Sequence, residues 1–179
     1  MSLIFIILIN MLLYISYEAT IIIYKILNQL IQFNNFMERE TYHSSTGAKI
    51  NLYSLFPMGD LRAVIHIAHG MAEHAIRYSR FASELTAAGY AVFAHDYRGH
   101  GFTEANDAPQ GVFGKSNGFS LVLEDQNEII NLIKERLPNK PIICFGHSLG
   151  SIINLNFALK YPNQANALAC WNSGIETGL

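Results

Sequence analysis

Ser148 lies in the run Gly146-His147-Ser148-Leu149-Gly150, a G-x-S-x-G pattern where an apolar segment meets an amphipathic one. This pattern is typical of a nucleophile elbow, a strained turn that lifts a serine hydroxyl above the end of a strand. Gly146 and Gly150 lack the side chains that would clash as the strand and the next helix approach each other. We therefore expect Ser148 to be a nucleophile, with the Leu149 N–H facing an oxyanion from the helix N-terminus. The alternative is a glycine-rich turn with an idle serine.

The chemistry of Ser148 needs helpers, because a serine hydroxyl is a poor nucleophile at neutral pH without an adjacent base. In chains with this elbow, the triad runs from serine to aspartate or glutamate and then to histidine. Downstream of Ser148 the sequence contains no histidine and one carboxylate, Glu176. We expect no histidine upstream of Ser148 to take the role of the triad histidine. The elbow fixes the direction of the Ser148 hydroxyl, and the His147 side chain should point away from that hydroxyl. The sequence therefore predicts a nucleophile without a triad acid or histidine among these 179 residues.

A second oxyanion donor is expected from the loop His69-Gly70-Met71-Ala72-Glu73-His74, which follows the apolar run 63–68. The Met71 N–H is the candidate, and Gly70 would allow a close approach. We expect His69, Glu73 and His74 to shape the loop rather than to perform chemistry. A metal site built from these three side chains is not expected, because they lack the H-E-x-x-H order.

A third block reads His95-Asp96-Tyr97-Arg98-Gly99-His100-Gly101. We expect Asp96 and Arg98 to form an ion pair that fixes the loop containing Gly99. His100 is expected to be a hydrogen-bonded part of the loop, although it is also placed to line the site.

Short apolar segments alternate with amphipathic ones from residue 63 onward. Strands are predicted at 42–44, 49–56, 63–68, 90–94, 141–145 and 167–171, and helices at 78–85, 122–137 and 149–160. This alternation predicts an α/β fold with an antiparallel start followed by parallel strands with right-handed crossovers. Cys144 and Cys170 both fall in predicted strands, where we expect a reduced pair in the core. A disulfide between neighbouring strands is the alternative.

The blocks HGMAEH, HDYRGHG and GHSLG, in this order and spacing, resemble the monoacylglycerol lipase/lysophospholipase group of the α/β-hydrolase fold, which is serine aminopeptidase S33-like. Arg77-Tyr78 and Phe93-Ala94 also match, and the resemblance covers roughly residues 38–171. It implies hydrolysis of monoacylglycerol or lysophospholipid esters through an acyl-enzyme on Ser148, with Met71 and Leu149 as oxyanion donors and no cofactor. It also implies that the cap, the acid, the histidine and the last strands come after the strand at 167–171. We therefore expect the N-terminal portion of such a fold, with about six strands and no activity of its own.

Residues 1–36 carry only Glu18 and Lys25 as charged residues, whereas residues 37–179 have the composition of a partial globular domain. An apolar run of about 20 residues is long enough for a membrane anchor, although a carboxylate weakens that interpretation. A surface helix, a signal peptide, a buried helix and a mistaken start before Met37 are the alternatives. The location is therefore expected to be membrane-associated or cytoplasmic, depending on whether residues 1–36 are translated.

Charged residues make up 15% of the chain and the net charge is −2, with no basic block. Nucleic-acid binding is therefore not expected, because it needs clustered Lys and Arg. The predicted edge strand 167–171 is apolar, and an uncovered edge of this kind favours self-association. Two functions stay open: a lipid-ester hydrolase by descent, and a non-catalytic, membrane-tethered remnant or binding module.

Overall fold

The computed structural model describes residues 16–23 and 37–174. The chain divides into two compact units, residues 1–36 and 37–179. In the first unit, residues 16–23 form a helix with exposed Tyr17, Ile22 and Ile23 side chains. Within the described ranges, no helix is long and apolar enough to cross a membrane. The other residues of the 1–36 segment, and most of the predicted anchor with them, lie outside the described part of the chain.

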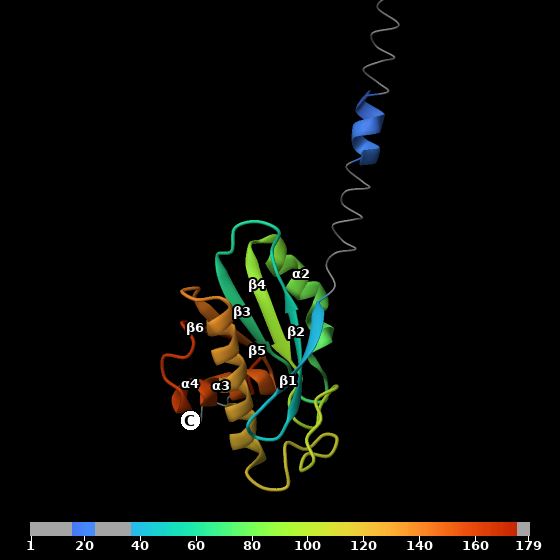
Figure 1. Cartoon of the computed structure of the whole chain (residues 1–179). Helices are drawn as coiled ribbons and strands as arrows, with labels where there is room; N and C mark the ends of the chain where they lie inside the picture. The colour runs from blue at the N-terminus through green and yellow to red at the C-terminus, as the bar shows by residue number, and fades with distance from the viewer. Residues whose placement is uncertain (1–15, 24–36, 175–179) are drawn as a thin grey trace, which may run out of the picture. The chain divides into compact units, whose positions relative to one another are not determined.

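The second unit is built on one six-stranded sheet (Figure 1). Its strands are β1 (Glu38–His43), β2 (Lys49–Leu55), β3 (Ala63–Ala68), β4 (Tyr90–His95), β5 (Ile142–His147) and β6 (Ala167–Trp171). They lie in the order β1-β2-β4-β3-β5-β6. The pairs β1–β2 and β2–β4 are antiparallel, and β4–β3, β3–β5 and β5–β6 are parallel. The predicted α/β fold with an antiparallel start is therefore confirmed.

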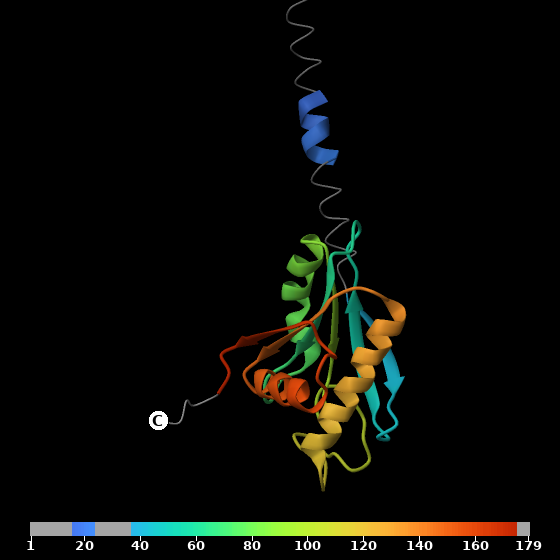
Figure 2. The same ribbon diagram turned by 90° about the vertical axis from the view of Figure 1, so that its left-hand side faces the viewer.

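Helical segments cover both faces of the sheet. They are η1 (Ala75–Tyr78), a 3₁₀ turn, followed by α2 (Ser79–Ala87), α3 (Gly118–Arg136) and α4 (Leu149–Lys160). One apolar core lies between the sheet and α3 with α4, and a second lies between the sheet and η1 with α2. Figure 2 shows the green α2 and the gold α3 on opposite sides of the strands. The sheet thus forms the middle layer of an α/β sandwich.

The predicted element boundaries differ from the observed ones mainly at the ends. β1 begins at Glu38, earlier than the predicted strand at 42–44, because its polar residues pair along the whole of β2. α3 begins at Gly118, one turn before the first apolar residue of its buried face, Val122. These differences leave the order and direction of the strands unchanged.

The two cysteines are both free, but they occupy different environments. Cys144 is buried in β5, and this burial raises the pKa of its thiol to about 12. Cys170 is exposed in β6, so the prediction of a pair in the core is wrong. The reason is position: β6 lies at the end of the described sheet, and four of its five side chains are exposed.

Candidate active site

The elbow at Ser148 has the backbone geometry that its sequence predicts. β5 ends at His147 and α4 begins at Leu149, so Ser148 alone makes the turn. Its φ of 52° and ψ of −115° lie in a region that L-residues rarely adopt. Such strain persists only where the surroundings enforce it, and it concentrates at functional sites.

Two glycines allow the tight turn. A Cβ atom on Gly146 would lie 2.5 Å from the carbonyl carbon of Gly150, and one on Gly150 would lie 2.0 Å from the Ala68 oxygen. Both contacts are too short for any other residue, so the strand and the helix approach as closely as the pattern predicts. The Ser148 N–H donates to the Trp171 carbonyl at 3.0 Å, which ties the elbow to β6.

Five histidines of the described residues have side-chain contacts with groups other than Ser148. His147 places Nδ1 3.3 Å from Glu73 Oε1, across the loop that follows β3. His66 and His95 hydrogen-bond each other, and the rings of His69 and His100 contact backbone carbonyls. Among residues 16–23 and 37–174, no imidazole hydrogen-bonds the Ser148 side chain. In the described residues Ser148 therefore has no imidazole as a hydrogen-bond partner.

The two expected oxyanion donors follow neighbouring strands. β3 and β5 are parallel and adjacent, with Ala68 opposite Gly146, so the loop at Met71 and the elbow at Leu149 emerge at the same end of the sheet. Ser151 N and Ile152 N both donate to the Ser148 carbonyl, whereas in the described part of the chain the Leu149 N–H has no backbone partner. A free N–H at a helix N-terminus is suited to binding an anion. The assignment of both donors stays a prediction.

The loop at Met71 is held by His69 and Glu73. The His69 Nε2 atom accepts a hydrogen bond from Tyr97 N, so Nδ1 carries the proton and donates to the Gly70 carbonyl at 2.8 Å. Burial lowers the pKa of His69 to about 4, which keeps the ring neutral near pH 7. Glu73 accepts from Gly70 N at 2.5 Å. Both side chains therefore contribute to the shape of the loop.

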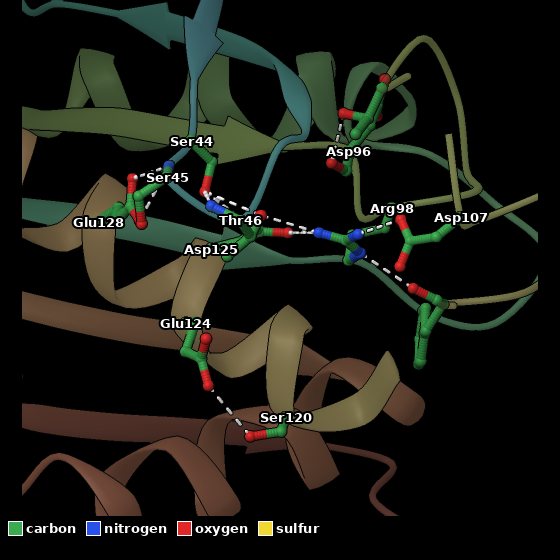
Figure 3. Close-up of polar contacts among 12 residues, drawn as sticks. Ser44, Ser45, Thr46, Asp96, Arg98, Asp107, Ser120, Glu124, Asp125 and Glu128 are labelled. Atoms are coloured by element: carbon green, nitrogen blue, oxygen red, sulfur yellow. Dashed lines mark hydrogen bonds and ion pairs between the residues drawn. The ribbon is translucent and has the colours of Figure 1, made fainter. Parts of the chain in front are cut away.

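The prediction that Asp96 pairs with Arg98 is wrong. Asp96 is buried and accepts hydrogen bonds from three nitrogen donors: Asn51 Nδ2, Ala75 N and Phe102 N. Arg98 instead lies between Asp107, at 2.5 Å, and Asp125, at 3.3 Å (Figure 3). Its Nη1 also donates to Thr46 Oγ1, in the turn between β1 and β2. Because Asp96 is already satisfied by nitrogens from three segments, Arg98 fixes the following loop to α3 and to that turn.

Sequence reasoning missed the partners of Arg98 and the lining of a cavity beside the elbow. Asp107, Asp125 and Thr46 give no local signal, because only the tertiary fold brings them to Arg98. A cavity of about 580 Å³ lies beside the elbow, lined by Glu73, Arg77, Tyr78, Phe81, Phe145, His147 and Trp171. Its aromatic residues come from η1, α2, β5 and β6, and each alone is typical of core packing. Among the described residues, no cluster of His, Cys, Asp or Glu is suited to a metal ion.

The mixed sheet with its crossover helices and the strained elbow after the fifth strand are the features of an α/β-hydrolase fold. Residues 59–178 match the hydrolase family described as serine aminopeptidase, S33, and the chain belongs to that family.

Curated relatives agree with this family. The chain is 32% identical over 114 residues to a monoglyceride lipase homolog of monkeypox virus, covering 60% of this chain and 37% of the relative. It is 34% identical over 112 residues to a monoacylglycerol lipase of Mycolicibacterium smegmatis, covering 63% of this chain and 38% of the relative. The chain thus spans less than two fifths of the length of these relatives. The predicted resemblance to the monoacylglycerol lipase group is confirmed.

A solved structure agrees on the fold. A highly thermostable carboxyl esterase from Bacillus coagulans, in complex with glycerol, superposes with a TM-score of 0.68 at 26% identity. The superposition covers 75% of this chain and 43% of the esterase. The described sheet therefore corresponds to part of a hydrolase fold.

Proposed function

We propose that Ser148 is the nucleophile of a carboxylic-ester hydrolase acting on monoacylglycerols or lysophospholipids. The strained elbow is the observation that carries this proposal, because it presents one hydroxyl beside a free helix N-terminus. In the reaction, Ser148 Oγ attacks the ester carbonyl carbon while its proton passes to a base. The alcohol leaves with a proton, and water then hydrolyses the acyl-serine and restores the hydroxyl. The N–H groups of Met71 and Leu149 would stabilise the oxyanion of both tetrahedral intermediates.

The reaction needs a base, and in the described residues none is hydrogen-bonded to Ser148. In the described ranges no imidazole hydrogen-bonds the Ser148 side chain, and removing the base from a serine hydrolase lowers kcat by roughly 10⁶-fold. We therefore expect residues 1–179 alone to hydrolyse esters slowly or not at all. If the flanking coding sequence specifies a strand-Asp and strand-His pattern, co-expression of that product should restore hydrolysis.

A fluorophosphonate probe and a monoacylglycerol assay test this proposal. Labelling and hydrolysis by the complemented protein should disappear in Ser148→Ala and persist in Ser116→Ala, which removes an exposed loop serine. Hydrolysis that survives Ser148→Ala would contradict the assignment of the nucleophile.

A non-catalytic binding module is the second candidate. It is favoured by the lack of a base at Ser148 in the described residues, combined with a formed cavity of about 580 Å³ next to it. In this case the chain would bind a lipid ester without converting it, and the probe would not label Ser148 even after complementation. Rapid turnover by residues 1–179 alone that depends on Ser148 would eliminate this candidate.

We further propose that residues 1–36 attach the protein to a membrane surface. The helix at residues 16–23 exposes Tyr17, Ile22 and Ile23, and such residues favour the lipid interface. Flotation of the full chain with phosphatidylcholine vesicles tests this. The double variant Ile22→Asp/Ile23→Asp should reduce the bound fraction severalfold, and an unchanged fraction would contradict the proposal.

A further inference from the structure

One oxygen of Glu73 is the meeting point of three donors beside the candidate site. Glu73 Oε1 accepts from Gly70 N at 2.5 Å and from Tyr78 Oη at 2.6 Å, and it lies 3.3 Å from His147 Nδ1. The Arg77 guanidinium faces the other oxygen, with Nε 3.6 Å from Oε2. The Glu73 side chain is only 14% exposed, so these contacts are largely shielded from water.

The contact with Gly70 constrains the backbone that carries the Met71 N–H. Glu73 holds the N–H of the peptide between residues 69 and 70, and His69 Nδ1 holds the carbonyl of the next peptide at 2.8 Å. In a planar trans peptide the carbonyl and the N–H point in opposite directions. Because the Gly70 carbonyl is turned toward the buried His69 ring, the Met71 N–H of the same peptide points the opposite way. Two side chains thus fix two consecutive peptides of the oxyanion loop, residues 69–71.

The contact with His147 reaches the other half of the site. His147 is the last residue of β5 and immediately precedes Ser148, so its position bears on the direction in which Leu149 N–H points. Glycine at position 70 leaves room for the two side chains to meet. A Cβ atom there would lie 2.7 Å from Glu73 Oε1 and 3.0 Å from His147 Nδ1.

We propose that Glu73 is a positioning residue: its carboxylate holds the oxyanion loop and the elbow at a fixed separation, so that the N–H groups of Met71 and Leu149 converge on one oxyanion. The catalytic role of this clamp rests on the proposed function of Ser148. The clamp itself, between residues 70 and 147, is a property of the folded chain.

The carboxylate has the right chemistry for this task. An ionised carboxylate only accepts hydrogen bonds and has about four lone-pair sites, whereas the amide of glutamine has one accepting oxygen. Burial alone would raise the pKa of Glu73, but the hydrogen bonds from Tyr78, Gly70 and His147 outweigh it and lower the pKa below the ordinary 4.5. Glu73 is therefore ionised at neutral pH, when all three donors are present.

¹H–¹⁵N NMR of the full chain at pH 7 tests the clamp without any need for turnover. In the wild type, the Gly70 amide proton should be shifted far downfield and protected from exchange, because a charged acceptor binds it. In Glu73→Gln, the Gly70 resonance should move upfield and exchange at least tenfold faster. The Met71 and Leu149 amides should both shift as well, although they follow different strands. The matched control is Glu84→Gln, which removes the same charge from an exposed position on α2 and should move none of the three resonances.

The wild-type measurement keeps the proposal testable even if Glu73→Gln does not fold. A freely exchanging Gly70 amide in the wild-type chain would overturn the clamp. So would a Glu73→Gln spectrum in which Gly70 shifts but Leu149 does not, because the two halves would then be independent. A failure of Ser148 to react with fluorophosphonate in the complemented protein would instead contradict the proposed function and leave the NMR result intact.

Discussion

β3 and β6 are parallel strands of one sheet with similar apolar composition, yet their environments are opposite. All six residues of β3 are buried, whereas four of the five in β6 are exposed. β3 lies between β4 and β5 and is covered by η1 on one face and α4 on the other. In the described residues, β6 has β5 along one edge only and exposes Trp171. An apolar run therefore predicts a strand, but its burial depends on which elements pack against it.

The interior region, by which we mean β3, β4, the loop at residues 96–103 and α3, also contains several buried polar groups. Arg98, Asp96 and Asp125 are all less than 3% exposed, and each is bonded to segments distant in sequence. The β6 edge has no comparable buried ion pair among its described residues. Ser148 lies between these regions, because its N–H is bonded to Trp171 while Gly150 of its helix packs on Ala68 of β3. Ser148 is thus held by a buried interior on one side and an exposed strand on the other.

Removing Arg98 should have the largest effect on the interior region. Arg98→Ala would leave the carboxylate of Asp125 buried without its cation, a change that destabilises proteins by about 3–5 kcal/mol. Urea unfolding followed by circular dichroism measures the effect. The control Arg136→Ala removes an arginine from its exposed pair with Glu40 and should reduce stability by less than about 1 kcal/mol. Equal effects of the two variants would mean that the interior ion pairs are no more important than surface ones.

A pair of truncations compares the two strands directly. Ile67→Ala in β3 removes a side chain with no exposed surface and should lower the free energy of unfolding by about 2–5 kcal/mol. Trp171→Ala in β6 removes a larger side chain that is 67% exposed, and it should lower stability by less than about 1 kcal/mol. Thermal melts of both variants against the wild type provide the measurement. A loss for Trp171→Ala as large as that for Ile67→Ala would show that something covers the β6 edge.

The contrast between β3 and β6 also shows which features of the fold can be predicted from the sequence. The alternation of strands and helices, the elbow and the glycines at 146 and 150 follow from local pattern, because a strained strand-to-helix turn depends on adjacent residues. The partner of Arg98 could not be predicted, since three nitrogen donors from different segments had already occupied Asp96. The exposure of Cys170 was also missed, because its neighbours in sequence are as apolar as those of Cys144. Local geometry is thus predictable here, whereas side-chain partners and burial need the fold.

Acid should destabilise the interior region through its histidines. His66 and His95 are buried and hydrogen-bond each other at 2.9 Å, and His66 Nδ1 and His95 Nε2 have no partner in the described residues. Burial lowers the pKa of His66 to about 4, from 6.5 when unfolded. Between pH 6.5 and pH 4 the unfolded chain therefore binds the proton more readily than the folded chain. The contribution of His66 to the free energy of unfolding is fully present above pH 6.5 and is lost as the pH decreases toward 4. A pKa difference of this size corresponds to roughly 3 kcal/mol for one proton.

Urea midpoints between pH 7.5 and 4.5 measure this dependence. His66→Gln should flatten the slope, because glutamine does not titrate, while His69 and His95 retain the remainder. His43→Gln, at an exposed position, should leave the slope as in the wild type. A slope that is the same in all three proteins would mean that the buried pair does not control the acid response.

The smallest expected change concerns the β6 edge itself, where association rather than stability should respond. An exposed apolar edge strand presents unpaired backbone groups to a second chain, and a lysine placed there opposes pairing. Ala169 is exposed at the centre of β6 and pairs with Phe145 of β5 on its inner side. We expect the full chain to self-associate and Ala169→Lys to shift it toward the monomer in sedimentation velocity, with a free energy of unfolding within about 0.5 kcal/mol of the wild type.

The control is Ala87→Lys, at an exposed site at the end of α2. It adds the same charge away from the edge and should leave association unchanged. If both lysines dissolve the assembly equally, net charge controls it. If neither lysine dissociates the assembly, the chains associate through another surface, and the exposed edge of β6 does not take part in the contact.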